Sequence, residues 1–325
     1  MLPPTIQDIR AAAEQIKRYA VVTPLIESQR LNARLGGRVL LKLETLQRAG
    51  AFKFRGAYNK ISRLSKEWNP GGVVACSSGN HAQGVADAAA LMGLPAVIVM
   101  PADSPAMKIA RTKALGAEVV TYDRETGDRV AISERIGRER NAVMVPPFDD
   151  PEIMAGQGTA GLEIVAQAAA IGARPELVLA PCSGGGLVSG LAIAVRSALP
   201  DAQVMAVEPE GFDDFTRSLA SGNCETNTRR SGSICDALLS PEPGVLTMVA
   251  CRAERVTGVA VSEAEVRAAI RYAFEELKLV VEPGGVIALA ALLSGQVSLR
   301  GRTAAVMLSG GNIDTSLFAE IIGGR

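Results

Sequence analysis

The chain has 325 residues, of which 48% are hydrophobic and 21% charged. This composition is typical of a globular protein of about two domains and excludes intrinsic disorder. The 34 basic and 34 acidic residues leave no net charge, and aromatic residues make up only 4%, so neither nucleic acid nor a membrane surface is an expected partner.

No secreted or membrane-spanning segment is expected. The longest apolar stretch, residues 88–102, is broken by Gly93 and Pro95 and is too short to cross a bilayer. Asp8 and Arg10 come before any hydrophobic run, so we expect no signal peptide and a cytoplasmic location. The five scattered cysteines form no C-x-x-C pair, and His81 is the single histidine, so a disulfide framework, a zinc site and histidine-based triads are not expected.

Strand-like and helix-like patterns alternate through most of the chain. Short continuous apolar runs, typical of parallel strands buried on both faces, lie at residues 73–76, 96–100, 117–122, 177–180, 204–208 and 304–308. Helices are expected at residues 104–115 and 187–199. A third begins at Ser262, where Glu265 completes a capping box, and Pro283 is expected to close that segment. This alternation predicts an α/β fold with helices around parallel sheets.

Two breaks rich in proline and glycine suggest how the chain divides into domains. They lie at residues 69–72 and 146–147. A small domain is therefore predicted at residues 71–148, inserted into a large domain formed by residues 1–70 and 149–325. The chain shows no internal repeat and no low-complexity segment.

The first candidate site residue is Lys53, which lies between Phe52 and Phe54. Burial, the neighbouring Arg55 and a nearby helix start would lower the pKa of its amine and favour the nucleophilic neutral form. The alternative is a lysine whose stem merely packs on the aromatic rings. Lys60, on the same helix face, is expected to be solvated.

Residues 77–84 follow a predicted strand and precede a predicted helix. Small hydroxyl and amide side chains, among them Ser77, Ser78 and Asn80, combine there with N–H groups at a helix start. Together these groups form a cradle for a carboxylate. The alternative is a polar helix cap with a solvent-facing His81.

A glycine-rich turn at residues 181–187 joins a predicted strand to a predicted helix. Consecutive glycines let backbone N–H groups converge, and the helix start adds its positive dipole end, so a phosphate fits there. The dinucleotide-binding glycine pattern fails at Ser189, and the chain has no Gly-Lys pair for a P-loop. The alternative is a merely tight turn.

A fourth polar loop, residues 309–312, follows the last predicted strand. Open α/β sheets bind ligands at the carboxyl ends of their strands, so this loop is a candidate part of the site. The alternative is a plain turn.

An activated lysine, a phosphate cup and a carboxylate cradle together suit pyridoxal phosphate and an amino acid. The chain resembles the fold-type II pyridoxal-phosphate enzymes, in the branch of serine/threonine dehydratases (threonine ammonia-lyases) and serine racemases. The motifs that carry this resemblance span nearly the whole chain, at residues 23–25, 42–44, 52–56, 77–84, 183–187, 282–285 and 309–312. The family implies a fold like that of tryptophan synthase β, with two open, twisted, mostly parallel sheets flanked by helices.

The resemblance also implies a role for each motif. Lys53 would be the Schiff-base lysine, Asn80 would face the cofactor's 3′-oxygen, and Ser309 would lie at the pyridine nitrogen. The implied cofactor-binding residues are Phe52, Lys53, Asn80, Ser183, Gly184, Gly185, Gly186, Leu187, Glu282 and Ser309; the substrate-binding residues are Ser77, Ser78, Asn80 and His81; the catalytic residues are Lys53 and Ser78. Ala51 stands where many relatives have serine, a departure that leaves the lysine intact and affects one local hydrogen bond.

The family further implies an assembly and a metal ion. We expect a homo-oligomer, either a dimer or a tetramer, without the ACT-type regulatory extension of biosynthetic threonine dehydratases. Relatives with a divalent cation site use a glutamate, a carbonyl and an acid at the spacing of Glu208, Phe212 and Asp214, and such oxygen ligands suit Mg²⁺ or Ca²⁺. The alternative is an acidic surface turn.

The activity implied by the resemblance is β-elimination. A hydroxy amino acid such as L-threonine or L-serine would lose water, and hydrolysis of the resulting unsaturated amine would give a 2-oxo acid and ammonia. Alternatives within the family are a serine racemase and a dehydratase for erythro-3-hydroxyaspartate or for an intermediate of hydroxyectoine breakdown. Outside it, the alternatives are a non-catalytic binding protein for the cofactor or another phosphate, and a nucleotide-binding oxidoreductase.

Overall fold

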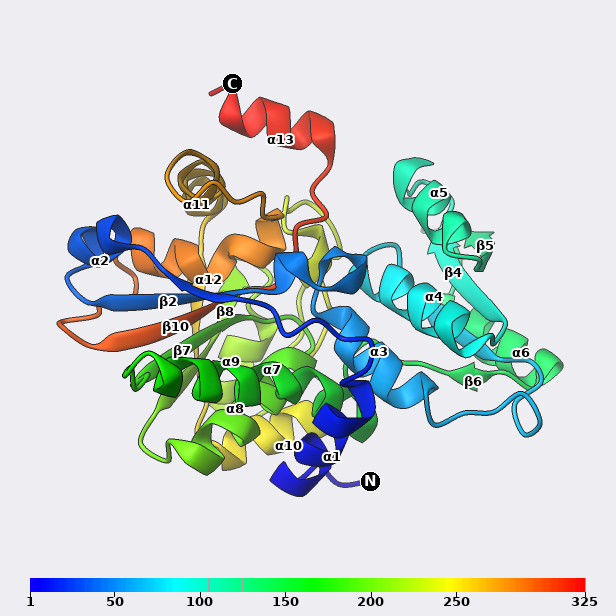
Figure 1. Ribbon diagram of the computed structural model, residues 1–325. Helices are drawn as coiled ribbons and strands as arrows, with labels where there is room; N and C mark the ends of the chain where they lie inside the picture. The colour runs from blue at the N-terminus through cyan, green and yellow to red at the C-terminus, as the bar shows by residue number, and fades with distance from the viewer. Residues whose placement is uncertain (105, 124–125, 325) are drawn as a thin grey trace.

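The computed structural model describes residues 1–104, 106–123 and 126–324, which form two sheets flanked by helices (Figure 1). The larger sheet has six strands in the order β1 (Leu25–Glu27), β2 (Arg38–Leu43), β10 (Thr303–Leu308), β7 (Leu177–Pro181), β8 (Gln203–Pro209) and β9 (Thr257–Val261). All neighbours in it are parallel except β1 and β2. The smaller sheet is parallel throughout, in the order β5 (Glu118–Tyr122), β4 (Ala96–Pro101), β3 (Val73–Cys76) and β6 (Val143–Met144). The predicted fold class is confirmed.

Helices cover both faces of each sheet (Figure 1). Those around the larger sheet are α1 (Ile6–Ile16), α2 (Gln29–Leu35), α7 (Pro151–Ala170), α8 (Gly186–Ala198), α9 (Asp214–Ser221), α10 (Val245–Ala253), α11 (Glu263–Glu275), α12 (Pro283–Leu293) and α13 (Thr315–Ile322). Those of the smaller sheet are α4 (Asn80–Met92), α5 (Ala106–Ala114) and α6 (Arg129–Arg140). Helix α3 (Lys53–Ile61) packs between α4 and α7, and its apolar residues share a core with the smaller sheet. The described residues also form short 3-10 turns: η1 (Glu44–Leu46), η2 (Arg48–Gly50) and η3 (Asp236–Leu238). The core beneath α11 and α12 and the core beneath α7, α8 and α10 lie on opposite faces of the larger sheet.

All six predicted strands are present, and four further strands were missed. β1 and β6 have only three and two residues, too few for a periodic signal. β2 was missed because Lys42 interrupts its apolar run, yet this lysine is fully buried. β9 contains Gly258, which leaves room for the side chain of Thr216.

One helix boundary was predicted wrongly. The helix that begins after Ser262 has the expected capping box with Glu265, but it ends at Glu275. Pro283 was expected to close it and instead opens the next helix, α12. Proline is favoured in the first turn of a helix because its missing N–H would have no intrahelical partner there. The Pro-Gly-Gly sequence at residues 283–285 therefore marks the start of a helix.

Candidate active site

The polar motifs predicted from the sequence lie together at the carboxyl ends of parallel strands. β3 is followed by residues 77–80, β7 by residues 183–186 and β10 by Ser309, which is where open α/β sheets bind ligands. These segments line a cavity of about 440 Å³. Its lining contains every predicted cofactor and substrate residue: Phe52, Lys53, Ser77, Ser78, Asn80, His81, Ser183, Gly184, Gly185, Gly186, Leu187, Glu282 and Ser309.

Lys53 is the first residue of α3 and extends into this cavity. Its Nζ donates a hydrogen bond to the carbonyl of Pro147 at 2.6 Å and lies 5.2 Å from the centre of the Phe52 ring. Burial lowers the pKa of Lys53 to about 8. Arg55 was expected to contribute to this shift, but burial is its only cause, and the guanidinium of Arg55 pairs with Glu44 and Glu163.

Other lysines near the site are held as ion pairs. Lys60 was expected to be solvated, but its side chain is only 13% exposed and its Nζ pairs with Asp150 at 2.8 Å and Glu152 at 3.0 Å. Lys42 is fully buried and pairs with Glu163 at 2.6 Å. Lys53 differs from both because its recorded hydrogen bond is to a neutral carbonyl.

The glycine-rich turn after β7 brings the backbone close to its neighbours. Gly185 has a φ of 93°, in the left-handed region, and an added Cβ there would lie 2.3 Å from the Phe215 ring. An added Cβ on Gly184 would lie 2.4 Å from the ring of Phe148. The N-terminus of α8 has no side-chain cap, so its free N–H groups and positive dipole end are available to an anion at the cavity wall.

Asn80 and Glu282 form a buried amide–carboxyl contact in the cavity. Asn80 Nδ2 donates to Glu282 Oε1 at 2.5 Å, and burial raises the pKa of Glu282 to about 7. Asn312 Nδ2 donates to Asn80 Oδ1 at 2.8 Å and to the carbonyl of Ala49 at 2.7 Å. Asn312 thus fixes which way the Asn80 amide points, a role that sequence reasoning missed even though it singled out the loop.

His81 is buried, which excludes the solvent-facing alternative. Its Nε2 lies 2.8 Å from the carbonyl of Val145; because a carbonyl only accepts, Nε2 carries the proton. Burial, and secondarily the charge of Lys53, lower the pKa of His81 to about 3. The ring is therefore neutral, and its Nδ1 has no hydrogen-bond partner among the described residues.

Several cavity residues were not found from the sequence. Lys108 on α5 and Arg129 at the start of α6 bring positive charge to the cavity wall, and Lys108 forms an ion pair with Asp236. Asp149 caps α10 by accepting hydrogen bonds from the N–H groups of Val245, Leu246 and Thr247. Charged residues scattered over loops and helix starts have no periodic pattern that would reveal them.

The residues of the expected metal site do not line the cavity, and both carboxylates are buried rather than on a surface turn. Glu208 accepts hydrogen bonds from the Thr216 hydroxyl at 2.6 Å and the Phe215 N–H at 3.1 Å. Asp214 Oδ2 has no partner among the described residues. Burial raises the pKa of Glu208 to about 8 and that of Asp214 to about 6. No group of three or more His, Cys, Asp or Glu side chains that could hold a metal is present in residues 1–104, 106–123 and 126–324.

No helix in the described part of the chain is long and apolar enough to cross a membrane.

Comparisons with known proteins agree with this geometry. The family model for "Pyridoxal-phosphate dependent enzyme" matches residues 16–310. An L-threo-3-hydroxyaspartate ammonia-lyase of Saccharomyces cerevisiae is 39% identical, covering 100% of this chain and 98% of that protein. An L-threonine ammonia-lyase of Thermotoga maritima is 40% identical, covering 98% and 78%. The structure of maize serine racemase is 35% identical with a TM-score of 0.91, covering 99% and 97%. The chain belongs to the pyridoxal-phosphate dependent enzymes, in the fold-type II group that contains the threonine and hydroxyaspartate ammonia-lyases and serine racemase.

Proposed function

We propose that this protein binds pyridoxal phosphate through Lys53 and converts a hydroxy amino acid to a 2-oxo acid and ammonia by β-elimination. The observation that carries this proposal is one cavity holding both a lysine of lowered pKa and an uncapped helix start with three consecutive glycines. The relatives named as ammonia-lyases support it.

The residues present fit the cofactor. The backbone of residues 183–187 would hold its phosphate, since no side chain obstructs the N–H groups of the three glycines. Ser309 would donate a hydrogen bond to the pyridine nitrogen, and Asn80, with its amide oriented by Asn312, would bind the 3′-oxygen. Phe52 and Glu282 complete this wall of the cavity.

The bound cofactor supplies an electron sink that acidifies the Cα proton of an attached amino acid. Once the amine of the substrate has displaced Lys53 from the cofactor, the freed Lys53 amine would act as the base that takes this proton, because its lowered pKa leaves part of the amine neutral near pH 8. Ser77, Ser78 and the N–H groups at the start of α4 would hold the substrate carboxylate, since α4 has no side-chain cap. Ser78 is also the proposed proton-transfer residue for racemisation.

We propose L-threonine or L-serine as substrate. A second candidate is a hydroxy amino acid with two carboxylates, such as 3-hydroxyaspartate. It is favoured by Lys108 and Arg129, which place two positive charges on the cavity wall where a distal carboxylate could bind.

The test is an assay of 2-oxo acid and ammonia release by the loaded protein. L-threonine, L-serine and the stereoisomers of 3-hydroxyaspartate are compared, and chiral analysis of the unreacted amino acid detects racemisation. Lys53→Ala serves as the matched inactive variant. Release from at least one substrate that depends on Lys53 supports β-elimination; isomer exchange alone makes the protein a racemase, and no turnover of any substrate contradicts the proposal.

We also propose that Glu208, the carbonyl of Phe212 and Asp214 bind Mg²⁺ or Ca²⁺. The support is the buried Asp214 Oδ2 that has no partner among the described residues, together with a second carboxylate close enough to raise the pKa of Glu208. Oxygen donors of this kind, completed by water, suit either ion.

The remaining proposals concern organisation. We propose a small domain at residues 71–148 and a large domain from residues 1–70 and 149–325. This division is supported by the smaller sheet, whose strands all lie within residues 73–144.

We propose a homo-oligomer, a dimer or a tetramer, to be tested by light scattering after gel filtration. A cytoplasmic location is supported by the five cysteines, which are all unpaired.

A further inference from the structure

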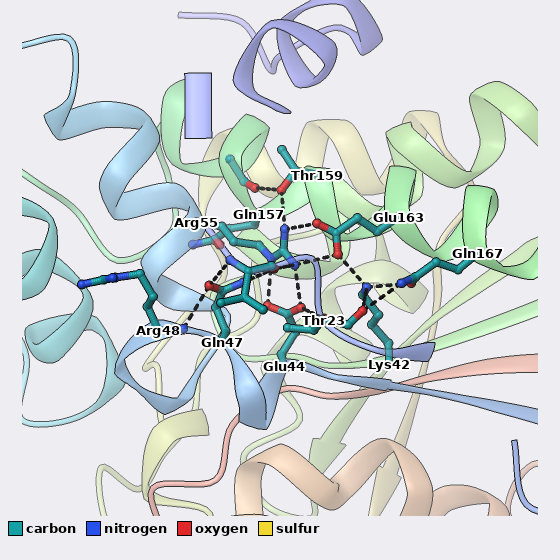
Figure 2. Close-up of polar contacts among 12 residues, drawn as sticks. Thr23, Lys42, Glu44, Gln47, Arg48, Arg55, Gln157, Thr159, Glu163 and Gln167 are labelled. Atoms are coloured by element: carbon teal, nitrogen blue, oxygen red, sulfur yellow. Dashed lines mark hydrogen bonds and ion pairs between the residues drawn. The ribbon is translucent and has the colours of Figure 1, made fainter. Parts of the chain in front are cut away.

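A buried charge cluster, shown in Figure 2, does not line the cavity and has no place in the proposed chemistry. It consists of Lys42, Glu44, Arg55 and Glu163, two cations and two anions. The side chains of Lys42, Glu44 and Arg55 have no exposed surface, and that of Glu163 is 17% exposed. The name "charge cluster" is kept below for these four residues.

Arg55 is the centre of the charge cluster. Its Nε and Nη2 donate to the two carboxylate oxygens of Glu44, both at 2.8 Å. Its Nη1 and Nη2 donate to the two oxygens of Glu163 at 2.7 and 2.9 Å. Further contacts to Thr159 Oγ1 and to the carbonyl of Val21, both at 3.2 Å, complete its hydrogen bonding. Two bidentate pairs of this kind fix the position and the plane of the guanidinium.

The other cation closes the charge cluster. Lys42 Nζ donates to Glu163 and to the carbonyl of Thr23, both at 2.6 Å, and to Gln167 Oε1 at 2.8 Å. All three ammonium hydrogens are used, so this buried lysine is held as a cation. The Thr23 hydroxyl donates to Glu44 at 2.6 Å. The charge cluster is therefore a fixed, electrically balanced unit.

The charge cluster is anchored to the edge of the sheet that carries the site. Glu44 directly follows β2, whose last residue, Leu43, pairs with Leu308. Leu308 is the residue before Ser309, so Glu44 and Ser309 leave neighbouring strands at the same level. Glu163 lies on α7, which packs against α3. Arg55 thus connects α3 to both the sheet edge and α7.

Lys53 is held from both sides along the chain. Before it, the N–H of Phe52 donates to the carbonyl of Ser309 at 3.0 Å. After it come Arg55 in the charge cluster and Gly56, whose N–H donates to Gln157 Oε1 at 3.2 Å. The start of α3 has no side-chain cap, so these tertiary contacts set the position of its first turn.

We propose that Arg55 is a positioning residue, which clamps the first turn of α3 through Glu44 and Glu163 so that the Lys53 amine stays at the reacting position in the cavity. This inference rests on the proposed attachment of the cofactor to Lys53. Stability alone does not account for such a cluster, because replacing a buried ion pair by apolar groups of similar volume is often neutral or stabilising.

The test separates cofactor binding from attachment to Lys53. Two probes are used: pyridoxal 5′-phosphate, whose aldehyde can react with the amine, and pyridoxine 5′-phosphate, an alcohol that binds through its phosphate and ring alone. Arg55→Met should leave the affinity for the alcohol within about twofold of the wild type, because the phosphate cup is untouched. Attachment of the aldehyde, followed by borohydride trapping and absorbance, should become about 100-fold slower, since a misplaced reacting group carries a penalty of that order.

Lys60→Met is the matched control. It removes an ion pair between the other end of α3 and residues Asp150 and Glu152, so it perturbs the same helix without touching the charge cluster. Lys60→Met should leave both the affinity for the alcohol and the rate of aldehyde attachment unchanged. The positioning role is overturned if Arg55→Met loses affinity for the alcohol together with attachment of the aldehyde. It is also overturned if Arg55→Met attaches the aldehyde at the wild-type rate.

If Arg55→Met does not fold, Glu163→Gln replaces it. This variant keeps the Arg55–Glu44 pair and weakens the ion pairs that connect Arg55 and Lys42 to α7, so the same selective loss is expected at smaller size. The inference is then overturned if Glu163→Gln attaches the aldehyde at the wild-type rate and binds the alcohol with wild-type affinity. Failure of the wild type itself to attach the aldehyde at residue 53 contradicts the proposed function instead.

Discussion

The chemistry of the cavity depends on how differently its neighbouring lysines are solvated and paired. Lys42 and Lys60 are ion-paired to carboxylates and lie outside the cavity lining. The ion pairs of Lys60 outweigh its burial and raise its pKa, whereas burial lowers the pKa of Lys42 in spite of its ion pair. Lys53 instead donates to the neutral carbonyl of Pro147, so the charge of its buried amine is not compensated in this way. Burial without a paired anion lowers the pKa of an amine, and Lys53, unlike Lys42 and Lys60, also lines the cavity, so Lys53 is the nucleophile and base of the proposed chemistry.

The lowered pKa of Lys53 predicts a pH dependence. The rate of cofactor attachment should rise with pH and reach half its maximum near the pKa of about 8, because the neutral amine is the reacting species. Stopped-flow absorbance of the cofactor-free protein mixed with pyridoxal phosphate measures this midpoint. A midpoint near 10.5, the ordinary value for lysine, would show that the amine is solvated.

At the scale of elements, the glycine-rich turn and the start of α8 form the proposed phosphate cup. Gly185 is required there for two separate reasons, since its φ is 93° and an added Cβ would contact Phe215 and Thr247 at 2.3 and 2.8 Å. Gly222 has a φ of 80° with nothing within 4 Å of an added Cβ. An alanine at position 222 would therefore introduce backbone strain alone, whereas one at position 185 would introduce strain and a steric clash.

Gly185→Ala should weaken cofactor binding by about tenfold or more, equal to about 1.4 kcal/mol, because the turn must move to relieve the contact with Phe215. Gly222→Ala should leave cofactor affinity unchanged and cost about 1–3 kcal/mol of stability from the strained φ alone. Fluorescence titration and urea unfolding measure the two quantities. Equal cofactor affinity in both variants would remove the phosphate role from the turn.

The proposed cation would lie where Glu208 near the end of β8 faces Asp214 at the start of α9. Chelation should lower Tm by about 5 °C and reduce activity, since loss of a tightly bound ligand removes a few kcal/mol of stability; added Mg²⁺ or Ca²⁺ should restore both. The double variant Glu208→Gln/Asp214→Asn should respond to neither chelator nor metal. Full activity and unchanged Tm of the chelated wild type would leave the two carboxylates as a metal-free buried pair.

The sequence was sufficient for features that are local or periodic. The six predicted strands, the Ser262 capping box and the glycine turn depend on neighbouring residues only, and all are present. The charge cluster could not be predicted, because Arg55 and Glu163 are 108 positions apart. The same holds for the contact between Asn80 and Asn312, which are separated by 232 positions. Such pairings depend on how helices pack on the sheet.

On the scale of the whole molecule, the cavity is built from both sheets. The larger sheet contributes the glycine turn, and helices of the smaller sheet contribute Asn80, Lys108 and Arg129. Lys53 comes from α3, which packs between the two parts, against α4 and α7. The ion pair between Lys108 on α5 and Asp236 in η3 connects the two parts at the cavity wall. A substrate with a distal carboxylate would compete with Asp236 for Lys108.

This competition predicts that two variants change the KM for 3-hydroxyaspartate in opposite directions. Lys108→Met should raise KM for 3-hydroxyaspartate several-fold, about tenfold at most for a partly exposed pair, and leave KM for L-threonine nearly unchanged. Asp236→Asn should lower KM for 3-hydroxyaspartate, because it frees Lys108. Steady-state assays measure the KM of each variant for both substrates. Parallel changes in the two KM values would show that the Lys108–Asp236 ion pair only holds α5 against η3.

The central claim is that Lys53 holds the cofactor in this cavity, and mapping the site of attachment tests it most directly. The wild-type protein is loaded with pyridoxal phosphate, reduced with borohydride, digested and analysed by mass spectrometry. A single labelled peptide containing residue 53, absent from Lys53→Ala, is the expected result. A label on Lys42, Lys60 or any other lysine, or labelling that persists in Lys53→Ala, would contradict the claim.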